Sequence, residues 1–548
     1  MMPNVHDSVL NAGIQGMMWL TKQFWWKPFI QQTHQPQLVQ HALLHHILSK
    51  NAQTTFGNSH QFRLIKDYQA YRQSIPIHTY EDLRPHIEAQ EETKEGCLNV
   101  EQPIMYTQTS GTTGKPKYIP VLQSTLKDYK NLQRLLVFAQ HQALPSIYHG
   151  KILAIASPAI EGKLETGTPF GSTSGLIYQG LPRFVQKKYI LPPDVLAIKE
   201  YDLKYLLIAA YGLAEPRLSL LASANPSTFL KLLDVIQQNY SKLLDLLANP
   251  EDGSFPTGFP FPHVTPGRIS ALNALRGQED RITLGTLWPQ LQAVATWTGG
   301  SCGVLIPKLR SLLPPTTSIV EMGYLSSEFI GSVNVDVQNN RCIPTFHENF
   351  FEFVEQDEWE KENPTILTLE EVEVGKRYYV IVTTQQGLYR YFINDIVEVT
   401  GFFNRTPTIQ FVQKGKGVTN LTGEKLYEHQ VICAMESVKK ECEAHFDFFM
   451  MLADAEHLQY TLYIEHQPLV APVGPILEKH LARLNIEFEA KRLSERLKPI
   501  KVTFLESGTA ETYKHHCVTN GQREAQFKLV KLLYTKDCTF PFSNHEIK

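Results

Sequence analysis

The sequence predicts an α/β protein with a large N-terminal domain of layered sheets and helices and a small α+β domain at the C-terminus. The chain of 548 residues is too long for a single hydrophobic core. Short apolar, strand-like segments alternate with helical ones over most of the chain. The composition changes at residues 414–417, Lys-Gly-Lys-Gly, which is typical of a flexible connector. We therefore expect a large domain over residues 1–413, a hinge at 414–418 and a small mobile domain over 419–548.

Composition excludes several classes of protein. Hydrophobic residues make up 43% of the chain and charged residues 20%, as in an ordinary globular protein. A net charge of −3 gives no overall attraction to nucleic acid or anionic membranes, so we expect neither partner. The seven cysteines include no C-x-x-C pair and no zinc spacing, which favours a reducing, cytoplasmic location. The chain lacks a secretory signal, and its longest apolar run, 205–214, is about half a membrane span, so we expect no stable membrane insertion. Nothing in the sequence indicates the oligomeric state.

The N-terminal 90 residues predict helices. Residues 17–30, MMWLTKQFWWKPFI, are aromatic, and such a segment either lies on a membrane surface or packs as a helix. We favour a helix that packs Trp19, Phe24 and Trp25 onto the body and ends at Pro28. Residues 37–90 have apolar positions near helical spacing. Within them, Thr79 followed by Asp82 predicts a helix N-cap.

The loop TQTSGTTGKPKYIPV, residues 107–121, lies between the strand-like segments 103–108 and 118–121. Its glycines let backbone N–H groups turn toward a ligand, its hydroxyls add donors, and its lysines bring positive charge, so it can surround phosphate oxygens. A Walker A loop is excluded, because that motif needs glycine where Thr109 stands and a hydroxyl residue where Pro116 stands, and runs into a helix. The alternative is a glycine-rich hairpin turn.

The middle of the chain predicts alternating helices and strands. Residues 123–142 predict a long amphipathic helix, and residues 225–248 predict another that begins at Asn-Pro. The segment 205–213, YLLIAAYGL, fits a buried helix or a strand equally well. Apolar or alternating segments predict strands within residues 151–158, 291–301, 318–335, 347–355 and 377–384. Beyond the connector, helices near 428–438 and toward the end alternate with strand-like segments at 446–452, 458–465 and 498–506.

Three further clusters carry possible site chemistry. In YLSSEF, residues 324–329, two hydroxyls beside a carboxylate suit magnesium and phosphate oxygens, although SSE is also a common helix cap. In LYRYFINDIVEVTGF, residues 388–402, Arg390 and Asp395 interrupt an apolar run, and a buried charge needs a partner or a ligand. Asp395 can accept two ribose hydroxyls or form an ion pair with Arg390. In TNLTGEKLYEHQ, Lys425 follows a glycine turn at the start of a helix, and taken singly it is a surface lysine.

Together and in chain order, these motifs resemble the plant-hormone-conjugating acyl-acid amido synthetases of the auxin-responsive promoter family. That family lies within the adenylate-forming enzymes related to acyl-coenzyme A synthetases and firefly luciferase. TSGTTGKPK, YLSSE and the segment 388–402 stand where the family has its phosphate loop, its tyrosine–glutamate motif and its ribose-binding aspartate. FFEFVE resembles the adenine-side aromatic segment, and NAQTTFG and SIPIHTYEDL are also similar, so the resemblance spans roughly residues 40–530.

The resemblance implies an ATP-dependent ligase that adenylates a carboxylic acid, releases pyrophosphate, and transfers the acyl group to an amino acid amine. It implies that residues 1–413 form the adenylation domain and that the small domain rotates between the two half-reactions. It implies a magnesium ion near Glu328. It implies three catalytic lysines: Lys117, Lys425 and Lys528. It implies nucleotide binding by Thr109, Ser110, Gly111, Thr112, Thr113, Gly114, Tyr324, Ser326, Ser327, Phe351, Arg390 and Asp395.

One position departs from the family pattern, which has glycine immediately before the aspartate, where this chain has Asn394. Asparagine is the next most tolerant residue for a left-handed backbone, so the assignment of Asp395 stands. Two alternatives to the amido synthetase stay open: an acyl-coenzyme A ligase with the same first step, and a non-catalytic nucleotide-binding interaction protein. Retention of Thr112, Glu328, Asp395 and Lys425 argues against the second. We expect WTGG and GSTSG to border the acyl pocket, whose acid and amine the sequence does not identify.

Overall fold

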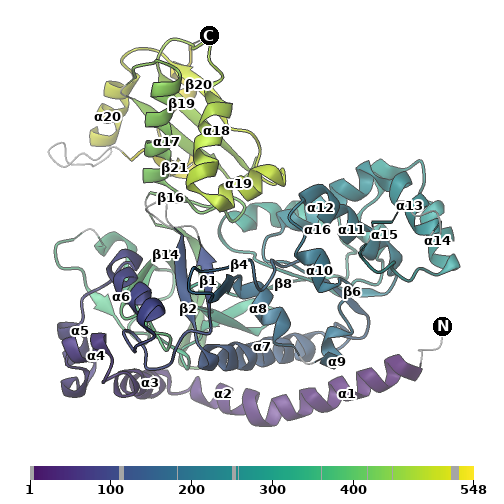
Figure 1. Ribbon diagram of the computed structural model, residues 1–548, viewed down its shortest axis with the longest axis horizontal. Helices are drawn as coiled ribbons and strands as arrows, with labels where there is room; N and C mark the ends of the chain where they lie inside the picture. Colours follow the sequence, from purple (N-terminus) through teal and green to yellow (C-terminus); the bar gives the residue numbers. More distant parts are fainter. Residues whose placement is uncertain are drawn as a thin grey trace. The chain divides into compact units, whose positions relative to one another are not determined.

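The structure, a computed structural model, describes residues 5–109, 116–181, 183–249, 255–256, 258–359, 361–415, 417–446, 448–519 and 530–547 (Figure 1). It contains two compact units. The N-terminal unit consists of Met1–Gln108, Tyr118–Gly299 and Ile306–Val412, and the C-terminal unit consists of Thr109–Lys117, Gly300–Leu305 and Gln413–Lys548. Helices and strands in both units confirm the predicted α/β class.

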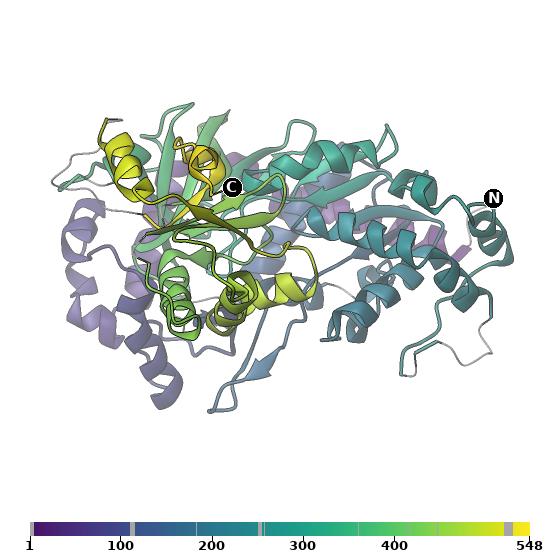
Figure 2. The same cartoon turned by 90° about the horizontal axis from the view of Figure 1, so that it is seen from above.

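A parallel four-stranded sheet forms one half of the N-terminal unit. Its strand order is β3 (Lys151–Ala154), β6 (Leu218–Ala222), β7 (Ala293–Thr296) and β8 (Ser318–Glu321). Parallel neighbours need crossover connections, and these contain α11 (Tyr201–Ala214), α12 (Ser227–Gln238) and α13 (Tyr240–Ala248) (Figures 1 and 2). The ambiguous segment 205–213 is therefore helical, and residues 225–248 form two helices instead of the predicted one. The carboxyl ends of β7 and β8 lead into the loops that carry WTGG and YLSSE.

An antiparallel sheet, a mixed sheet and an antiparallel hairpin form the other half of the unit. The larger has the order β12 (Ile366–Leu367), β11 (Asn349–Glu355), β13 (Arg377–Thr384), β14 (Tyr391–Phe403) and β15 (Thr406–Lys414). A second sheet has the order β2 (Lys117–Val121), β1 (Met105–Thr109), β5 (Pro169–Gly171) and β4 (Gly162–Lys163). A short hairpin consists of β9 (Ser332–Asp336) and β10 (Arg341–Pro344). The strands on either side of the predicted phosphate loop are thus confirmed.

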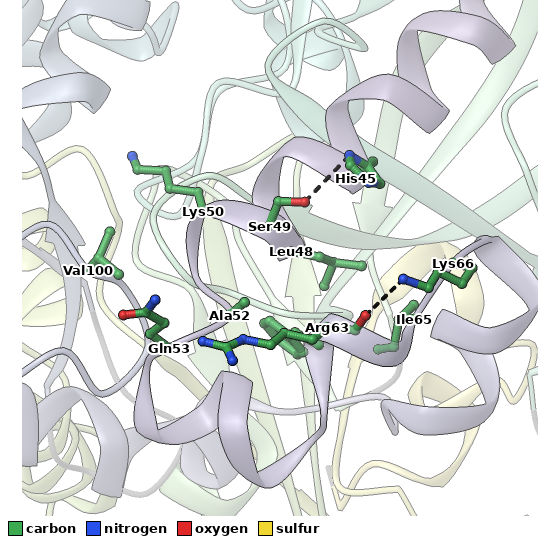
Figure 3. Close-up of a pocket in the computed structure, with 11 residues that line it drawn as sticks. His45, Leu48, Ser49, Lys50, Ala52, Gln53, Arg63, Ile65, Lys66 and Val100 are labelled. Carbon is green, nitrogen blue, oxygen red and sulfur yellow. Dashed lines mark hydrogen bonds between the residues drawn. The ribbon is translucent and has the colours of Figure 1, made fainter.

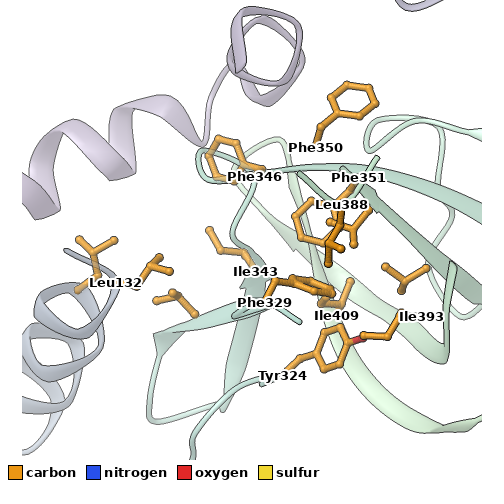
Figure 4. Close-up of a cluster of buried hydrophobic side chains, with 14 of the residues drawn as sticks. Leu132, Tyr324, Phe329, Ile343, Phe346, Phe350, Phe351, Leu388, Ile393 and Ile409 are labelled. Carbon is orange, nitrogen blue, oxygen red and sulfur yellow. The ribbon is translucent and has the colours of Figure 1, made fainter. Parts of the chain in front are cut away.

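Helices cover these sheets and share their core. The helices before the first strand are α1 (Val5–Thr21), α2 (Lys27–Gln32), α3 (Pro36–Lys50), α4 (Thr55–Ser59), α5 (Tyr68–Ser74) and α6 (Tyr80–Thr93). The predicted cap of α6 is confirmed, because the Thr79 backbone N–H donates to Asp82 Oδ2 at 2.7 Å. The long helix α7 (Gln123–Ala143) contributes Leu132 to a core that extends to Ile409 of β15 and includes Tyr324 and Phe351 (Figure 4).

The aromatic N-terminal segment packs only partly as predicted. Trp25 is partly buried against the core, as expected, but Trp19 and Phe24 are 61% and 64% exposed, whereas Trp26 and Phe29 are buried. A π-helical turn, Lys22–Trp26, lies between α1 and α2, and its extra residue rotates the aromatic positions relative to the body. The helix also continues through Pro28, which lies in the first turn of α2, where a missing N–H costs little.

The C-terminal unit has its own core. Its sheet has the order β20 (Lys501–Leu505), β19 (Gln459–Glu465), β18 (Phe449–Asp454) and β21 (Leu532–Tyr534). The accompanying helices are α17 (Glu428–Glu441), α18 (Val473–Leu484), α19 (Ile486–Leu493) and α20 (Thr509–Thr519). In neither unit does a helix of the described ranges have the length and apolarity needed to cross a membrane.

Candidate active site

Two loops at the carboxyl edge of the parallel sheet are tied together by one carboxylate. Glu321, the last residue of β8, accepts hydrogen bonds from Thr298 N and Oγ1, both at 2.6 Å, and from Gly323 N at 2.8 Å. Trp297 Nε1 donates to the Gly323 carbonyl at 3.0 Å. Ligands of open α/β sheets bind at this edge, so these bonds fix two loops at the expected place for a site.

The YLSSE loop meets the strand that carries the predicted ribose-binding aspartate. Tyr324 Oη donates to Asp395 Oδ2 at 2.5 Å, and Tyr391 Oη donates to Glu328 Oε1 at 3.4 Å. Asp395 and Glu328 are 2% and 4% exposed. Burial, and then the negative charge of Asp395, raise the pKa of Tyr324, so its phenol stays protonated and remains a donor. The structure therefore brings together three predicted site residues, Tyr324, Glu328 and Asp395, from two motifs that are far apart in the chain.

A bulge in β14 presents Asp395 to this cluster. Tyr379 and Ile381 of β13 pair with Ile396 and Phe392 of β14. Between these two pairs β13 advances by two positions and β14 by four. Asn394 lies inside this bulge with a φ of 59°, the left-handed conformation expected of the residue that replaces glycine. Bulges of this kind redirect side chains, and here the backbone turn determines where the Asp395 carboxylate points.

Hydrogen bonds from two other elements hold the YLSSE loop in place. Thr107 Oγ1 of β1 donates to the Ser327 carbonyl at 2.9 Å, and the Gln386 side-chain amide donates to the Glu328 carbonyl. Ser326 Oγ donates to the Phe329 carbonyl at 3.1 Å and accepts from Phe329 N at 3.2 Å. The hydroxyl of Ser326 thus closes a turn, and the contact shown for Ser327 is through its backbone. The loop is fixed relative to the strand that runs into the predicted phosphate loop.

Arg390 has a different partner from the one considered in the sequence. Its guanidinium forms a two-bond ion pair with Glu352 of β11, Nε to Oε2 and Nη2 to Oε1, both at 2.9 Å. Its Nη1 also donates to the carbonyls of Arg72 and Ile75. Both charged side chains are buried. The Arg390–Asp395 ion pair is therefore wrong, and these contacts make Arg390 an anchor between α5 and the start of β14, where the sequence had indicated a nucleotide-binding residue.

Phe351 lies in the hydrophobic core, and a different aromatic residue, Phe411, stacks on Tyr324. Phe351 is 1% exposed, and its ring centroid lies 6.0 Å from that of Phe329 and 6.2 Å from that of Phe353. It is a core residue behind Phe329, which itself contacts Tyr324 at 5.5 Å. Phe411 of β15, which the sequence analysis missed, is half-buried and stacks on Tyr324 with centroids 5.9 Å apart and an interplanar angle of 20°.

The predicted phosphate loop is only partly described. Thr109 ends β1 and Lys117 begins β2, and both side chains are buried. Ser110, Gly111, Thr112, Thr113 and Gly114 lie outside the described residues. Lys528 does as well.

Lys425 lies on a tightly bonded turn in the C-terminal unit. Its φ is 43°, and its carbonyl accepts from Asn485 Nδ2 at 3.1 Å. The preceding residue, Glu424, is completely buried and accepts from Leu421 N, Thr422 N and Tyr460 Oη at 2.6, 2.7 and 2.6 Å. Glu424 thus determines the shape of the turn that displays Lys425. In the sequence, the only sign of this turn was the acidic residue Glu424 directly after Gly423.

The candidate site offers a carboxylate ligand that suits magnesium, but no complete set of protein ligands. Within the described residues no group of three or more His, Cys, Asp or Glu side chains could hold a metal. Magnesium commonly binds through one or two carboxylates and takes its other ligands from phosphate oxygens and water. Glu328 supplies such a carboxylate at the edge of the parallel sheet.

Comparison with known proteins identifies the family. Three family models match in chain order: the GH3 family N-terminal domain at residues 26–318, the GH3 family central domain at 342–414 and the GH3 family C-terminal domain at 429–536. The first alone covers more than half of the chain. The chain belongs to the GH3 family. The resemblance inferred from the motifs is thereby confirmed.

Individual GH3 relatives are distant in sequence but extend over the same length. Indole-3-acetic acid-amido synthetase GH3.4 of Arabidopsis thaliana is 23% identical, with 95% of this chain and 94% of that protein covered. Indole-3-acetic acid-amido synthetase GH3.15 of Arabidopsis thaliana is 27% identical over 75% of this chain and 73% of that protein. This GH3 protein thus differs from its relatives at most positions.

Solved structures share the fold. The GH3.15 acyl acid amido synthetase superposes with a TM-score of 0.64 at 20% identity, covering 94% of this chain and 95% of that one. A 2-hydroxyisobutyryl-CoA ligase, solved with 2-HIB-AMP and CoA, has a TM-score of 0.50 at 12% identity, covering 91% and 89%. The GH3 chain therefore has the fold of these two proteins.

Proposed function

We propose that this GH3 protein is an ATP-dependent acyl-acid amido synthetase. A small carboxylic acid attacks the α-phosphorus of ATP, pyrophosphate leaves, and the acyl-adenylate then reacts with an amino acid amine to give an amide and AMP. The observation that carries the proposal is the Tyr324–Asp395 hydrogen bond. It joins the YLSSE loop to the aspartate segment at the carboxyl edge of a parallel sheet, in a chain of a family whose relatives bear the name amido synthetase.

Asp395 and its neighbours bind the nucleoside in this proposal. A carboxylate has lone pairs for several donors, so Asp395 can accept ribose hydroxyls as well as the Tyr324 phenol. The stacked rings of Tyr324 and Phe411 offer a flat apolar surface suited to a purine. Arg390 and Phe351 support these groups from behind: the arginine anchors β14, and the phenylalanine packs against Phe329.

The reacting phosphate is bound by the loop between β1 and β2. Donors from Thr109 through Gly114, together with Lys117, neutralise the charge that develops when the carboxylate attacks phosphorus. Glu328 would hold a magnesium ion, which would supply further positive charge for the phosphate oxygens. Ser326 and Ser327 act indirectly, because they shape the loop that presents Glu328.

The second half-reaction uses the C-terminal unit. Segment 414–418 is a hinge, and Gly417 within it has a φ of +73°, a conformation that favours glycine. Rotation at such a hinge exchanges the groups over one bound intermediate, so Lys425 and Lys528 each serve one half-reaction. The loops WTGG and GSTSG border the acyl pocket, and the protein acts in the cytoplasm.

Pyrophosphate release tests the proposal. The protein is incubated with ATP, magnesium and a panel of aromatic and aliphatic acids, and the products formed with mixed amino acids and coenzyme A are identified by mass spectrometry. Acid-dependent release with an amide product is expected. A thioester would assign the chain to the acyl-coenzyme A ligases, and ATP binding without release would favour a binding protein.

A further inference from the structure

A pocket of about 530 Å³ lies on the N-terminal unit, between α3 and the 3₁₀ turn η2 (Phe62–Leu64) (Figure 3). Small-molecule sites commonly have volumes of about 300–1,000 Å³, so the pocket has the size of a ligand site. It shares no lining residue with the candidate active site. The proposed ligase chemistry therefore does not account for it.

The lining of the pocket is positively charged. Lys50, Arg63 and Lys66 line it, and no Asp or Glu does. Lys50 Nζ lies 3.3 Å from Glu101 Oε2, and Lys66 Nζ donates to the Arg63 carbonyl at 3.1 Å. The Arg63 guanidinium is exposed, and within the described part of the chain it has no hydrogen bond or ion pair. A planar guanidinium of this kind can bind a carboxylate or phosphate through two parallel hydrogen bonds.

The sequence segment that contains these three residues has no acidic residue of its own. Residues 8–66 contain no Asp or Glu, although the whole chain has 55 of them. The same segment contains five Lys and Arg residues: Lys22, Lys27, Lys50, Arg63 and Lys66. A concave surface lined by charges of one sign raises the local concentration of ions of the opposite sign. The pocket thus lies on a segment with a net positive charge, although the net charge of the protein is −3.

The floor of the pocket is apolar. Leu48, Phe62 and Ile65 line the pocket and are 4%, 2% and 6% exposed. Figure 3 shows Leu48 and Ile65 among the polar side chains of the lining. Only a few per cent of each of these side chains is exposed, so the apolar contact area of this floor is small. A ligand with a short apolar body would cover it and place its charged group at the rim.

We propose that this pocket binds a small organic anion, a carboxylate or phosphate group on a short apolar body, with Arg63 as its main contact. Lys66 and Lys50 add positive charge at the rim, and Leu48 and Ile65 contact the apolar body. The site is separate from the acid and nucleotide sites of the proposed ligase.

Calorimetric titration of the full-length protein with phenyl phosphate tests the site, with AMP present to occupy a nucleotide site. Arg63→Gln should weaken binding at least tenfold. Gln53→Glu should do the same, because this isosteric change places a carboxylate in the exposed lining of the pocket. Arg281→Gln, an exposed arginine elsewhere in the unit, should leave the affinity unchanged. Equal affinity in Arg63→Gln and the wild type, or no binding to the wild type at millimolar phenyl phosphate, would overturn the proposal.

Two further probes identify the class of ligand. Phenyl phosphate should bind several times more tightly than inorganic phosphate; equal affinities would show that the apolar floor contributes nothing. Vesicles containing phosphatidic acid should bind no better to the wild type than to Arg63→Gln. Vesicle binding that depends on Arg63, without phenyl phosphate binding, would replace the small ligand by a lipid headgroup. None of these measurements requires catalysis, so failure of the pocket and failure of the ligase proposal are distinguishable.

Discussion

At the scale of single residues, the Tyr324 hydroxyl is the group whose removal tests the nucleoside site most directly. Tyr324→Phe keeps the ring and its stacking on Phe411 but removes a 2.5 Å hydrogen bond to a buried carboxylate. Such a loss costs about 1–3 kcal/mol. We expect about tenfold weaker ATP binding, measured by calorimetry, with near-normal secondary structure. Tyr463→Phe in the C-terminal unit is the control, and equal ATP affinities in the two variants would contradict the role of Tyr324.

The Arg390–Glu352 pair makes a second prediction at this scale, one that concerns stability. Replacing one member of a buried pair leaves the other charge uncompensated, so Arg390→Met should lower the free energy of unfolding by about 3–5 kcal/mol. The solvent-accessible pair Arg377–Glu398, whose side chains are 53% and 34% exposed and 3.1 Å apart on the same sheet, provides the control. Arg377→Met should cost no more than about 1 kcal/mol. Urea denaturation measures both changes, and similar losses in the two variants would show that Arg390 is not an anchor.

Among single residues, the backbone conformation of Asn394 could be predicted from the sequence, whereas the partner of Arg390 could not. Asn394 could be interpreted from the sequence, because the need for a left-handed backbone follows from which residue replaces glycine. The partner of Arg390 could not, since Glu352 is 38 positions away and becomes a neighbour only through the register of three strands. Asp395, a few residues along β14, was the nearer candidate in the sequence. The bulge directs it to Tyr324 instead.

At the scale of elements, a pair of carboxyls joins α7 to the start of β11. Asp128 and Glu348 share a hydrogen bond, and Gln385 Nε2 donates to Asp128 Oδ2 at 3.3 Å and to Glu348 Oε2 at 2.9 Å. Burial, and then the charge of Asp128, raise the pKa of Glu348 to about 8. Between about pH 4.5 and pH 8 the unfolded chain therefore binds fewer protons at this position than the folded protein, and stability falls as the pH rises.

Glu348→Gln should remove that pH dependence. The amide is neutral at every pH and can still donate to Asp128, so the variant should be more stable than the wild type at pH 8.5, on the order of 1–3 kcal/mol. At pH 4.5 the difference should vanish. Urea denaturation across the pH range measures it, with Glu398→Gln, a partly exposed carboxylate of β14, as the control. A constant difference at all pH values would mean that Glu348 does not titrate in this window.

The loop after β7 makes a second prediction at the element scale. A Cβ at Gly299 would lie 2.6 Å from the Phe411 carbonyl oxygen, so any side chain there must push β15 and its stacked ring away from Tyr324. Gly299→Ala should slow acid-dependent pyrophosphate release at least tenfold. Gly267→Ala, where a Cβ meets nothing within 4 Å, should have no effect. Comparable rates in the two variants would show that the contact between this loop and β15 is unimportant for the site.

The positions of helices and strands were easier to predict from the sequence than the directions in which their side chains face. The strands around the phosphate loop and the cap of α6 follow from local patterns of apolar, glycine and capping residues. The exposure of Trp19 and Phe24 does not, because the π-helical turn that contains Phe24 changes the helical phase between the positions before it, which include Trp19, and the positions after it. The division of residues 225–248 at Asn239 also depends on packing that the apolar pattern alone does not contain.

At the scale of the whole molecule, the two compact units carry different parts of the proposed chemistry. Asp395 and Glu328 belong to the N-terminal unit, and Lys425 belongs to the C-terminal unit. If the units rearrange between adenylation and amide formation, a side chain of the C-terminal unit contacts the reacting groups in only one of the two steps. Lys425→Ala should therefore change the two rates unequally, by factors that differ at least tenfold.

Separate assays measure the two steps. Pyrophosphate release in a single turnover gives the adenylation rate, and the decay of isolated acyl-adenylate with added amino acid gives the rate of amide formation. Asp395→Ala should slow adenylation chiefly through at least tenfold weaker ATP binding, about 1.4 kcal/mol. Lys501→Ala, at the exposed start of β20, should change neither rate. Because a fixed arrangement of the units would keep Lys425 equally close to both reactions, equal factors for the two steps in Lys425→Ala would argue against the hinge at residues 414–418.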